Sequence, residues 1–220
     1  MNLEKSISML MGVLLSFAIL GGCGMADQNE KQVQGETNTP QPSALKDDFT
    51  KGYLTSAKEV EKGYFEFKSQ TDGYTMLFPR DAVISDDFGN EKRANEFESI
   101  MYGYNLKGAS ISTRITYENK PSTRDIEEKL RLLSVTAGYD ESFKKIHAKG
   151  KTIYYAKKTS ELKNSNAYVN LSFIKAGNSN QAVEFIFNTR CKKNDQSCQS
   201  NVEDLENAAL KVMTSVHFEQ

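Results

Sequence analysis

The sequence is poor in the residues and motifs on which most enzyme active sites depend. It has no Trp, only two His, at positions 147 and 217, and only three Cys in 220 residues. Two distant histidines leave little material for a His-based metal site or catalytic triad. Gly-rich phosphate loops, Gly-x-Ser-x-Gly elbows, His-Glu zinc motifs and nucleophile–His pairs are all missing. We therefore expect no catalytic residues, no metal and no cofactor, although the plentiful Asp and Glu leave a catalytic carboxylate pair open.

The chain also lacks a charge excess of either sign. It carries 28 Lys and Arg against 29 Asp and Glu, a formal net charge of −1. A nearly neutral chain has no global electrostatic attraction to nucleic acid, so we expect no nucleic-acid partner. The length suits one domain or two small ones.

Long apolar runs are scarce too, and the clearest one lies at the start. Residues 7–20 are mostly apolar and follow Lys5. This run is too short to cross a hydrocarbon core of about 30 Å comfortably, and it is typical of the apolar segment of a secretory signal. A buried N-terminal helix and a permanent membrane anchor are the alternative interpretations.

The residues after this run are Leu20-Gly21-Gly22-Cys23. They resemble the lipobox of bacterial lipoproteins, in which an apolar residue and two small residues precede an acylated Cys. The resemblance implies cleavage between Gly22 and Cys23, acylation of Cys23 with a diacylglyceryl group and a palmitate-type chain, and anchoring to the outer face of the cell membrane. Two acyl chains anchor a protein far better than one.

The next two dozen residues are polar, with Pro40 and Pro42 near their end. Such a composition cannot bury enough surface to fold. We therefore predict residues 1–22 as a signal peptide, 23–46 as the lipidated Cys and a disordered tether, and 47–220 as a single globular domain.

Strand signals dominate that domain. Runs rich in aromatic and β-branched residues are separated by short polar or Gly-containing turns, and they cover residues 64–67, 74–78, 82–85, 96–105, 109–118, 143–149, 152–160, 167–175, 182–189 and 216–218. In the fifth run Ile111, Thr113, Ile115 and Tyr117 share one face, which predicts a strand with one buried side.

Two helices interrupt the strands. The clearer one begins at Pro121-Ser122, with Ser122 as its expected N-cap, and Gly138 is placed to end it. The second is expected from about Val202 to Met213, with Asn201 as N-cap. The order predicts an α+β fold: a single antiparallel sheet of about six to eight strands packed with two helices.

The segment from Gly73 to Pro79, Gly-Tyr-Thr-Met-Leu-Phe-Pro, is similar to an early strand of the Mog1/PsbP-like group. The final helix running into Thr214-Ser215-Val216-His217-Phe218 resembles that group's usual ending. The resemblance covers about residues 63–218 and implies an α/β/α sandwich. It supplies no shared catalytic residues, and it implies a role in binding or assembling other proteins.

Cys191 and Cys198 remain once Cys23 is acylated. They stand seven positions apart in a polar loop. Export to an oxidising compartment favours a disulfide between them. Free thiols or a redox pair are the alternatives, although a redox role usually uses Cys-x-x-Cys at a helix N-terminus.

Three further patterns have a functional and a structural interpretation. The acidic loop 86–91 lacks the spacing of a calcium loop and reads as a solvated turn. Tyrosines that could form an exposed cluster are Tyr102, Tyr104, Tyr154 and Tyr155, although core packing is the simpler role. A basic bias could contact anionic lipid or wall polymer or could protect exposed strands; it comprises Lys144, Lys145, Lys149, Lys151, Lys157, Lys158, Lys163, Lys192 and Lys193.

Taken together, these features predict a lipid-anchored, extracytoplasmic, non-enzymatic binding or assembly module of the cell envelope. Its expected partners are the membrane, through the lipid on Cys23, and an envelope protein or an anionic envelope polymer. A small-ligand or wall-polymer binder is the alternative, and it requires a concave pocket with a few convergent polar groups. A hydrolase is a further alternative.

Overall fold

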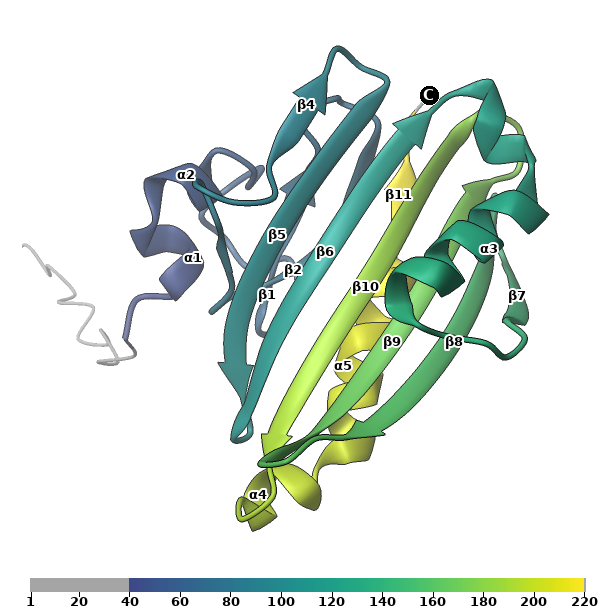
Figure 1. Cartoon of the computed structure of the whole chain (residues 1–220). Helices are drawn as coiled ribbons and strands as arrows, with labels where there is room; N and C mark the ends of the chain where they lie inside the picture. The colour runs from purple at the N-terminus through teal and green to yellow at the C-terminus, as the bar shows by residue number, and fades with distance from the viewer. Residues whose placement is uncertain (1–39, 220) are drawn as a thin grey trace, which may run out of the picture. The chain divides into compact units, whose positions relative to one another are not determined.

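An eight-stranded antiparallel sheet forms the middle layer of the fold, with a helix on each face (Figure 1). The computed structural model describes residues 40–219. The strands follow the order β3-β5-β6-β10-β9-β8-β7, and β4 also pairs with β5. Their bounds are β3 Val83–Ile84, β4 Glu91–Arg93, β5 Phe97–Leu106, β6 Ala109–Asn119, β7 Lys144–Ala148, β8 Lys151–Glu161, β9 Ser165–Ala176 and β10 Gln181–Lys192.

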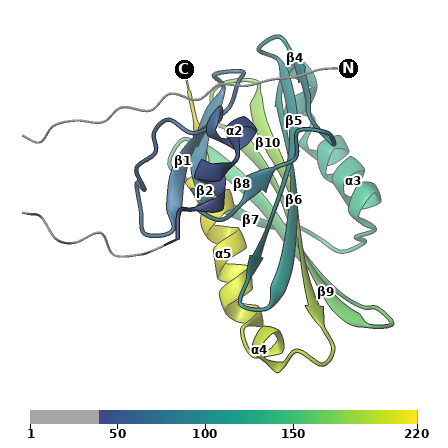
Figure 2. The ribbon, with the colours of Figure 1, turned by 90° about the vertical axis from the view of Figure 1, so that its left-hand side faces the viewer.

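A second, three-stranded sheet covers part of one face of this central sheet. It contains β1 (Tyr64–Lys68), β2 (Tyr74–Pro79) and β11 (His217–Phe218), with β2 in the middle. Helix α5 (Val202–Ser215) lies on the same side, whereas α3 (Ile126–Ala137) lies on the opposite side (Figure 2). The remaining helical turns are α1 Ser43–Lys46, α2 Asp48–Lys51, the 3₁₀ turn η1 Pro121–Arg124 and α4 Gln196–Gln199.

The predicted α+β class, with antiparallel strands and two long helices, is confirmed, but the strands are divided between two sheets. Side chains on one face of β2, Tyr74 and Phe78 among them, are fully buried. Their rings pack against the face of the central sheet, Tyr74 on Tyr117 and Phe78 on Tyr102. The β1–β2 hairpin therefore contacts the larger sheet face to face and does not extend it edge to edge.

The main core lies between the two sheets and α5 and is rich in aromatic rings. Phe67 stacks on Tyr53 and on Phe78, and all three are buried. A smaller core under α3 is built around Leu133 and Phe173. The alternation predicted for β6 is confirmed, since Ile111, Thr113, Ile115 and Tyr117 are all buried on the inner face.

Helix α3 starts later than the sequence analysis predicts. Residues 121–124 form a 3₁₀ turn, and the N-cap is Asp125, whose Oδ1 accepts a hydrogen bond from the Glu128 N–H at 3.1 Å. Ser122 is therefore not the cap. Gly138 ends the helix as expected, in the left-handed conformation with φ 60°.

The folded part begins a few residues before the predicted boundary at 47. Ser43–Lys46 forms α1, Ala44 is fully buried, and its N–H donates to the Arg80 carbonyl at 3.1 Å. Burial of Ala44 and this hydrogen bond attach the end of the predicted tether to the domain. The rest of that prediction, with the signal peptide, lies outside the described residues.

Between residues 40 and 219, no helix is both long enough and apolar enough to span a membrane.

Candidate binding pocket between helix α5 and the central sheet

A pocket of about 280 Å³ lies between the first turns of α5 and the inner face of the central sheet. This volume is just below the usual range for sites that bind drug-sized molecules. The strands contribute Lys157, Lys158, Thr159, Tyr168, Val169, Asn170 and Thr189, and α5 contributes Val202, Leu205 and Glu206.

Helix α5 forms one wall because its apolar stripe fixes it to the sheet. Leu205, Ala209, Val212 and Met213 are buried, at spacings of three and four residues along the helix. Leu205 is buried against the sheet, and the next residue, Glu206, lies beside strand β8, where it pairs with Lys157. The α5 wall is therefore apolar near the floor of the pocket and charged at its rim.

The floor of the pocket is neutral and polar. Asn170 of β9 and Thr189 of β10 are 4% and 1% exposed. Asn170 Oδ1 accepts a hydrogen bond from the Tyr155 hydroxyl at 2.6 Å. Thr189 Oγ1 has no hydrogen-bond partner among the described residues. A buried hydroxyl without a partner is unfavourable, so Thr189 is a lining residue whose hydrogen-bonding capacity is unsatisfied.

An ion pair stands at the rim. Lys157 Nζ lies 3.0 and 3.1 Å from the two carboxylate oxygens of Glu206. The Tyr155 hydroxyl lies 3.1 Å from Glu206 Oε1 as well. Burial and then the nearby Glu206 charge raise the pKa of Tyr155 well above its ordinary value, which keeps this hydroxyl protonated as a hydrogen-bond donor.

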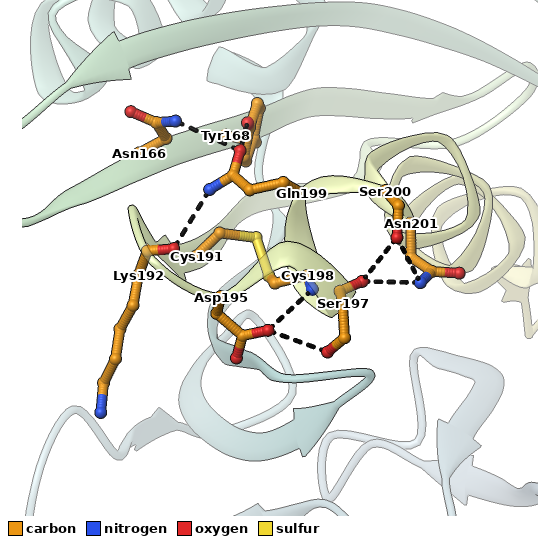
Figure 3. The surroundings of a disulfide bond; sticks show 10 residues. All are labelled: Asn166, Tyr168, Cys191, Lys192, Asp195, Ser197, Cys198, Gln199, Ser200 and Asn201. Carbon is orange, nitrogen blue, oxygen red and sulfur yellow. Dashed lines mark hydrogen bonds between the residues drawn. A yellow bond between two sulfur atoms is a disulfide. The ribbon is translucent and has the colours of Figure 1, made fainter.

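A disulfide fixes the chain that leads into α5 (Figure 3). Cys191 at the end of β10 and Cys198 in α4 are fully buried and bonded, with a Cα–Cα distance of 5.6 Å. Closing a loop of this length stabilises a fold by about 2–3 kcal/mol in the chain-entropy model. The N-cap of α4 is Asp195, which accepts from the Cys198 N–H at 3.1 Å, and this bond lowers the pKa of that carboxyl.

Gln199 connects the disulfide loop to the pocket. Its Oε1 accepts a hydrogen bond from the Tyr168 hydroxyl at 3.1 Å, and its Nε2 donates to the Lys192 carbonyl at 3.2 Å (Figure 3). Tyr168 lines the pocket. The loop therefore holds both the start of α5 and one aromatic wall residue in place.

A larger groove of about 800 Å³ lies between the β8–β9 end of the sheet and β11. Two of its polar side chains, Lys151 and Gln181, are engaged within the fold. Lys151 Nζ donates to the Thr214 carbonyl at 2.6 Å, and Gln181 Nε2 donates to the Gly73 and Glu219 carbonyls at 3.0 and 2.8 Å. The smaller pocket is the stronger candidate because its floor carries an unpartnered polar group.

The lysines of the basic bias are spread over both faces and edges, and several have structural contacts. Lys151 donates to carbonyls at the end of α5, and Lys158 donates to the Gly138 carbonyl at the end of α3. Lys157 pairs with Glu206, and Lys193 Nζ pairs with Glu161 at 2.5 Å. Lys144 and Lys145 lie on β7, the edge strand of the sheet.

The four tyrosines Tyr102, Tyr104, Tyr154 and Tyr155 do not form an exposed cluster. Tyr102 and Tyr155 are buried in the main core, and Tyr104 packs on Tyr102. Tyr154 lies on the other face of the sheet, in the core under α3. Of these, only Tyr155 approaches the pocket, through its bond to Asn170.

Gly22 and Cys23 lie outside the described residues. The acidic stretch 86–91 is largely exposed, and within the described part of the chain no group of three or more His, Cys, Asp or Glu side chains could hold a metal ion.

The sequence analysis missed Asn170, Thr189, Tyr168 and Glu206. The available signals were an Asn between the apolar residues Val169 and Leu171 and a Thr in phase with buried Phe187 and Phe185. Neither signal reveals that the two strands and α5 meet around a cavity.

Comparison with known proteins supports the lipoprotein assignment. A curated relative from Bacillus subtilis (strain 168), called "Putative lipoprotein YvcA", is 28% identical over 98% of this chain and 97% of its own length. Among solved structures, the Saccharomyces cerevisiae Ran-binding protein Mog1p has a TM-score of 0.44 at 9% identity, covering 70% of this chain and 94% of its own. A Bacteroides thetaiotaomicron protein has a TM-score of 0.44 at 13% identity, covering 73% of this chain and 50% of its own.

A family model named for YvcA and Mog1p matches residues 40–217, nearly all of the described chain. This match agrees with the Mog1/PsbP-like resemblance of the Gly73–Pro79 strand. The chain belongs to the family described as "Putative lipoprotein YvcA".

Proposed function

We propose that this protein is a non-enzymatic binding module of the cell envelope, held on the extracytoplasmic face of the cell membrane by a lipid on Cys23. This membrane location is supported by the lipoprotein name of the B. subtilis relative and by the segment Leu20-Gly21-Gly22-Cys23. In this account the folded domain presents a binding site, and the lipid keeps that site close to the membrane surface.

The observation that carries the binding role is the pocket beside α5. It is concave and rigidly framed, and its floor has a buried, unpartnered Thr189 hydroxyl next to Asn170. Such a combination of an apolar wall with a few convergent polar groups is typical of ligand sites.

The placement of the perturbed carboxylates favours binding over hydrolysis. Burial raises the pKa of Glu98 and of Glu184. Glu98 is bonded to Ser69 and Gln70, and Glu184 lies near Arg114 on the opposite face of the sheet, so neither lines the pocket. A hydrolytic site would instead bring such groups together in the cleft.

Site-specific photo-crosslinking in the native envelope tests this function. A photoreactive residue replaces Thr159, an exposed residue lining the pocket, and the matched control carries it at Val135, which is 70% exposed on α3 across the sheet. We expect an envelope component to be captured from position 159 and not from position 135. Capture of nothing from either position, or the same components from both, would contradict a binding role for this pocket.

A further inference from the structure

We propose that the pocket beside α5 binds one ring of a neutral sugar. This inference rests on the proposed binding function and narrows it to a ligand class. It follows from the size, the charge and the hydrogen-bonding groups of the pocket.

The size limits the ligand to a small unit. At about 280 Å³, the pocket falls just below the usual range for drug-sized ligands. Two sides are already fixed, because the disulfide between Cys191 and Cys198 holds the start of α5 and the sheet forms the floor. One ring of a larger glycan, with its neighbours leaving through the rim, meets this limit.

The charge distribution favours a neutral ligand. The pocket is lined by two lysines and one glutamate. Lys157 is paired with Glu206 at 3.0 and 3.1 Å. The Lys158 ammonium group donates to the Gly138 carbonyl at the end of α3, on the other face of the sheet. A phosphate or carboxylate entering beside Lys157 would meet the Glu206 carboxylate, and an ammonium group would meet Lys157. Only a ligand without net charge leaves the pair intact and adds no buried, uncompensated charge.

The floor favours hydroxyl groups as binding partners. The Thr189 hydroxyl can donate one hydrogen bond and accept others, but it has no partner among residues 40–219. Asn170 has its Oδ1 engaged by Tyr155, which leaves its N–H donors for a ligand. A sugar hydroxyl both donates and accepts, so one hydroxyl can satisfy Thr189 while a second accepts from Asn170.

The walls suit the less polar faces of a sugar ring. Val202 and Leu205 stand on the α5 side, and Tyr168, held by Gln199, stands on the β9 side. The C–H groups of the ring would cover this apolar surface, while its hydroxyls point to the floor and to the ion pair at the rim.

An NMR titration of the full-length chain tests the proposal, in a detergent without a sugar head group. The probes are glucose and N-acetylglucosamine as neutral sugars, glucuronate as the anionic sugar and glucosamine as the cationic one. We expect saturable shifts of the Asn170 side-chain amide resonance with a neutral sugar, and at least tenfold weaker binding of both charged sugars.

Thr189→Val is the decisive variant, because it keeps the side-chain shape and removes the unpartnered hydroxyl. Affinity for the neutral sugar should fall about three- to tenfold, the effect of losing one neutral hydrogen bond. Its unfolding midpoint without ligand should be no lower than that of the wild type. Thr113→Val is the matched control, since Thr113 is equally buried on β6 but does not line the pocket, and it should bind the sugar like the wild type.

Preferential binding of a charged sugar, no saturable shift with either neutral sugar, or equal affinity of Thr189→Val and the wild type would overturn the sugar assignment. These results are distinct from a failure of the binding function itself. If photo-crosslinking from position 159 captures an envelope component while neither neutral sugar binds, only the ligand class is wrong. If crosslinking captures nothing, the proposed binding function is contradicted, and the sugar assignment that rests on it is contradicted as well.

Discussion

Glu98 is a carboxylate buried at the junction of the two sheets. It is only 2% exposed and accepts hydrogen bonds from the Ser69 hydroxyl at 2.6 Å and from the Gln70 N–H at 3.0 Å. These bonds hold the β1–β2 turn against β5. Burial, the largest influence, raises the pKa of Glu98 even though both bonds act in the other direction.

The raised pKa predicts that stability falls as pH rises. A Glu with a raised folded-state pKa contributes stability that is fully present below its unfolded pKa, about 4.3, and is lost as pH rises through the folded pKa. Glu98→Gln removes this titration and can keep both hydrogen bonds. Its amide oxygen accepts from the Gln70 N–H, and its amide group donates to Ser69 while the Ser69 hydroxyl donates to Thr71, 2.6 Å away. Urea unfolding between pH 4 and pH 8 should therefore show a smaller loss of unfolding free energy in the variant.

Part of the slope should persist in Glu98→Gln, because burial also raises the pKa of Glu184. Glu141→Gln, at an exposed position after α3, is the matched control and should retain the wild-type slope. If Glu98→Gln and the wild type lose stability in parallel over this pH range, the buried carboxyl is not the source of the pH dependence.

At Gly73 the structural reason for the residue could not be predicted from the sequence. The sequence marks it only as the first residue of a strand similar to one in the Mog1/PsbP-like group. In the structure a Cβ at this position would lie 2.2 Å from the ring of Tyr117, which stacks on Tyr74. The requirement for Gly comes from a ring on β6, far away in the chain, and no local pattern contains that information.

At the scale of elements, strand β8 stabilises the ends of both long helices. Neither α3 nor α5 has a basic residue in its last turn. Lys151 supplies a charge to carbonyls at the end of α5, and Lys158, on the other face of β8, supplies one at Gly138 after α3. Cations are favourable at helix C-termini because of the helix dipole and the free carbonyl groups.

Lys151→Met tests this role. The variant keeps most of the aliphatic stem but loses the charge and the hydrogen bonds to the Thr214 and Val216 carbonyls. We expect the free energy of unfolding to fall by about 1–2 kcal/mol, as for a partly buried charged hydrogen bond at a helix end. Chemical denaturation of the variant and the wild type measures the difference.

Lys149→Met, two residues earlier on the exposed turn before β8, is the comparison. It should change stability by less than about 0.5 kcal/mol, as exposed substitutions usually do. Equal losses in both variants would mean that the effect comes from general charge or solvation and not from the cap on α5.

The positions of most strands and of the two long helices could be predicted from the sequence, but the way in which they pack into two sheets could not. Alternation located β5, β6 and β8 to β10, and the apolar spacing of Leu205 and Ala209 located α5, because local side-chain periodicity specifies these elements. The pairing of β2 with β11 joins residues at the two ends of the domain. Nothing in either short strand indicates that they, with β1, form a separate sheet.

At the scale of the whole molecule, the candidate site depends on that unpredicted assembly. Asn170, Thr189 and Glu206 come from two strands and a helix, and only the packing of α5 on the sheet brings them together. The disulfide of Cys191 with Cys198 was accessible from spacing and compartment, because both partners lie in one short loop. The sequence does not show that this disulfide lies directly before α5, the helix that forms one wall of the pocket.

We propose a folded binding module that begins near Pro40 and is attached to a membrane surface through Cys23. Membrane anchoring is the central claim, because it decides which envelope components the pocket can reach. The family match supports it through the lipoprotein name. A lipid on Cys23 is the chemical form in which we propose this anchoring.

Mass spectrometry of the N-terminal peptide of the mature protein, purified from the membranes of its own cells, is the most direct measurement. The account predicts a peptide that begins at Cys23, carries a diacylglyceryl group on its Sγ, and is accompanied by no peptide from residues 1–22. The Cys23→Ala variant should remain uncleaved and should not take up a labelled palmitate analogue. A wild-type chain that retains residues 1–22, or one whose Cys23 bears no lipid, would contradict the account.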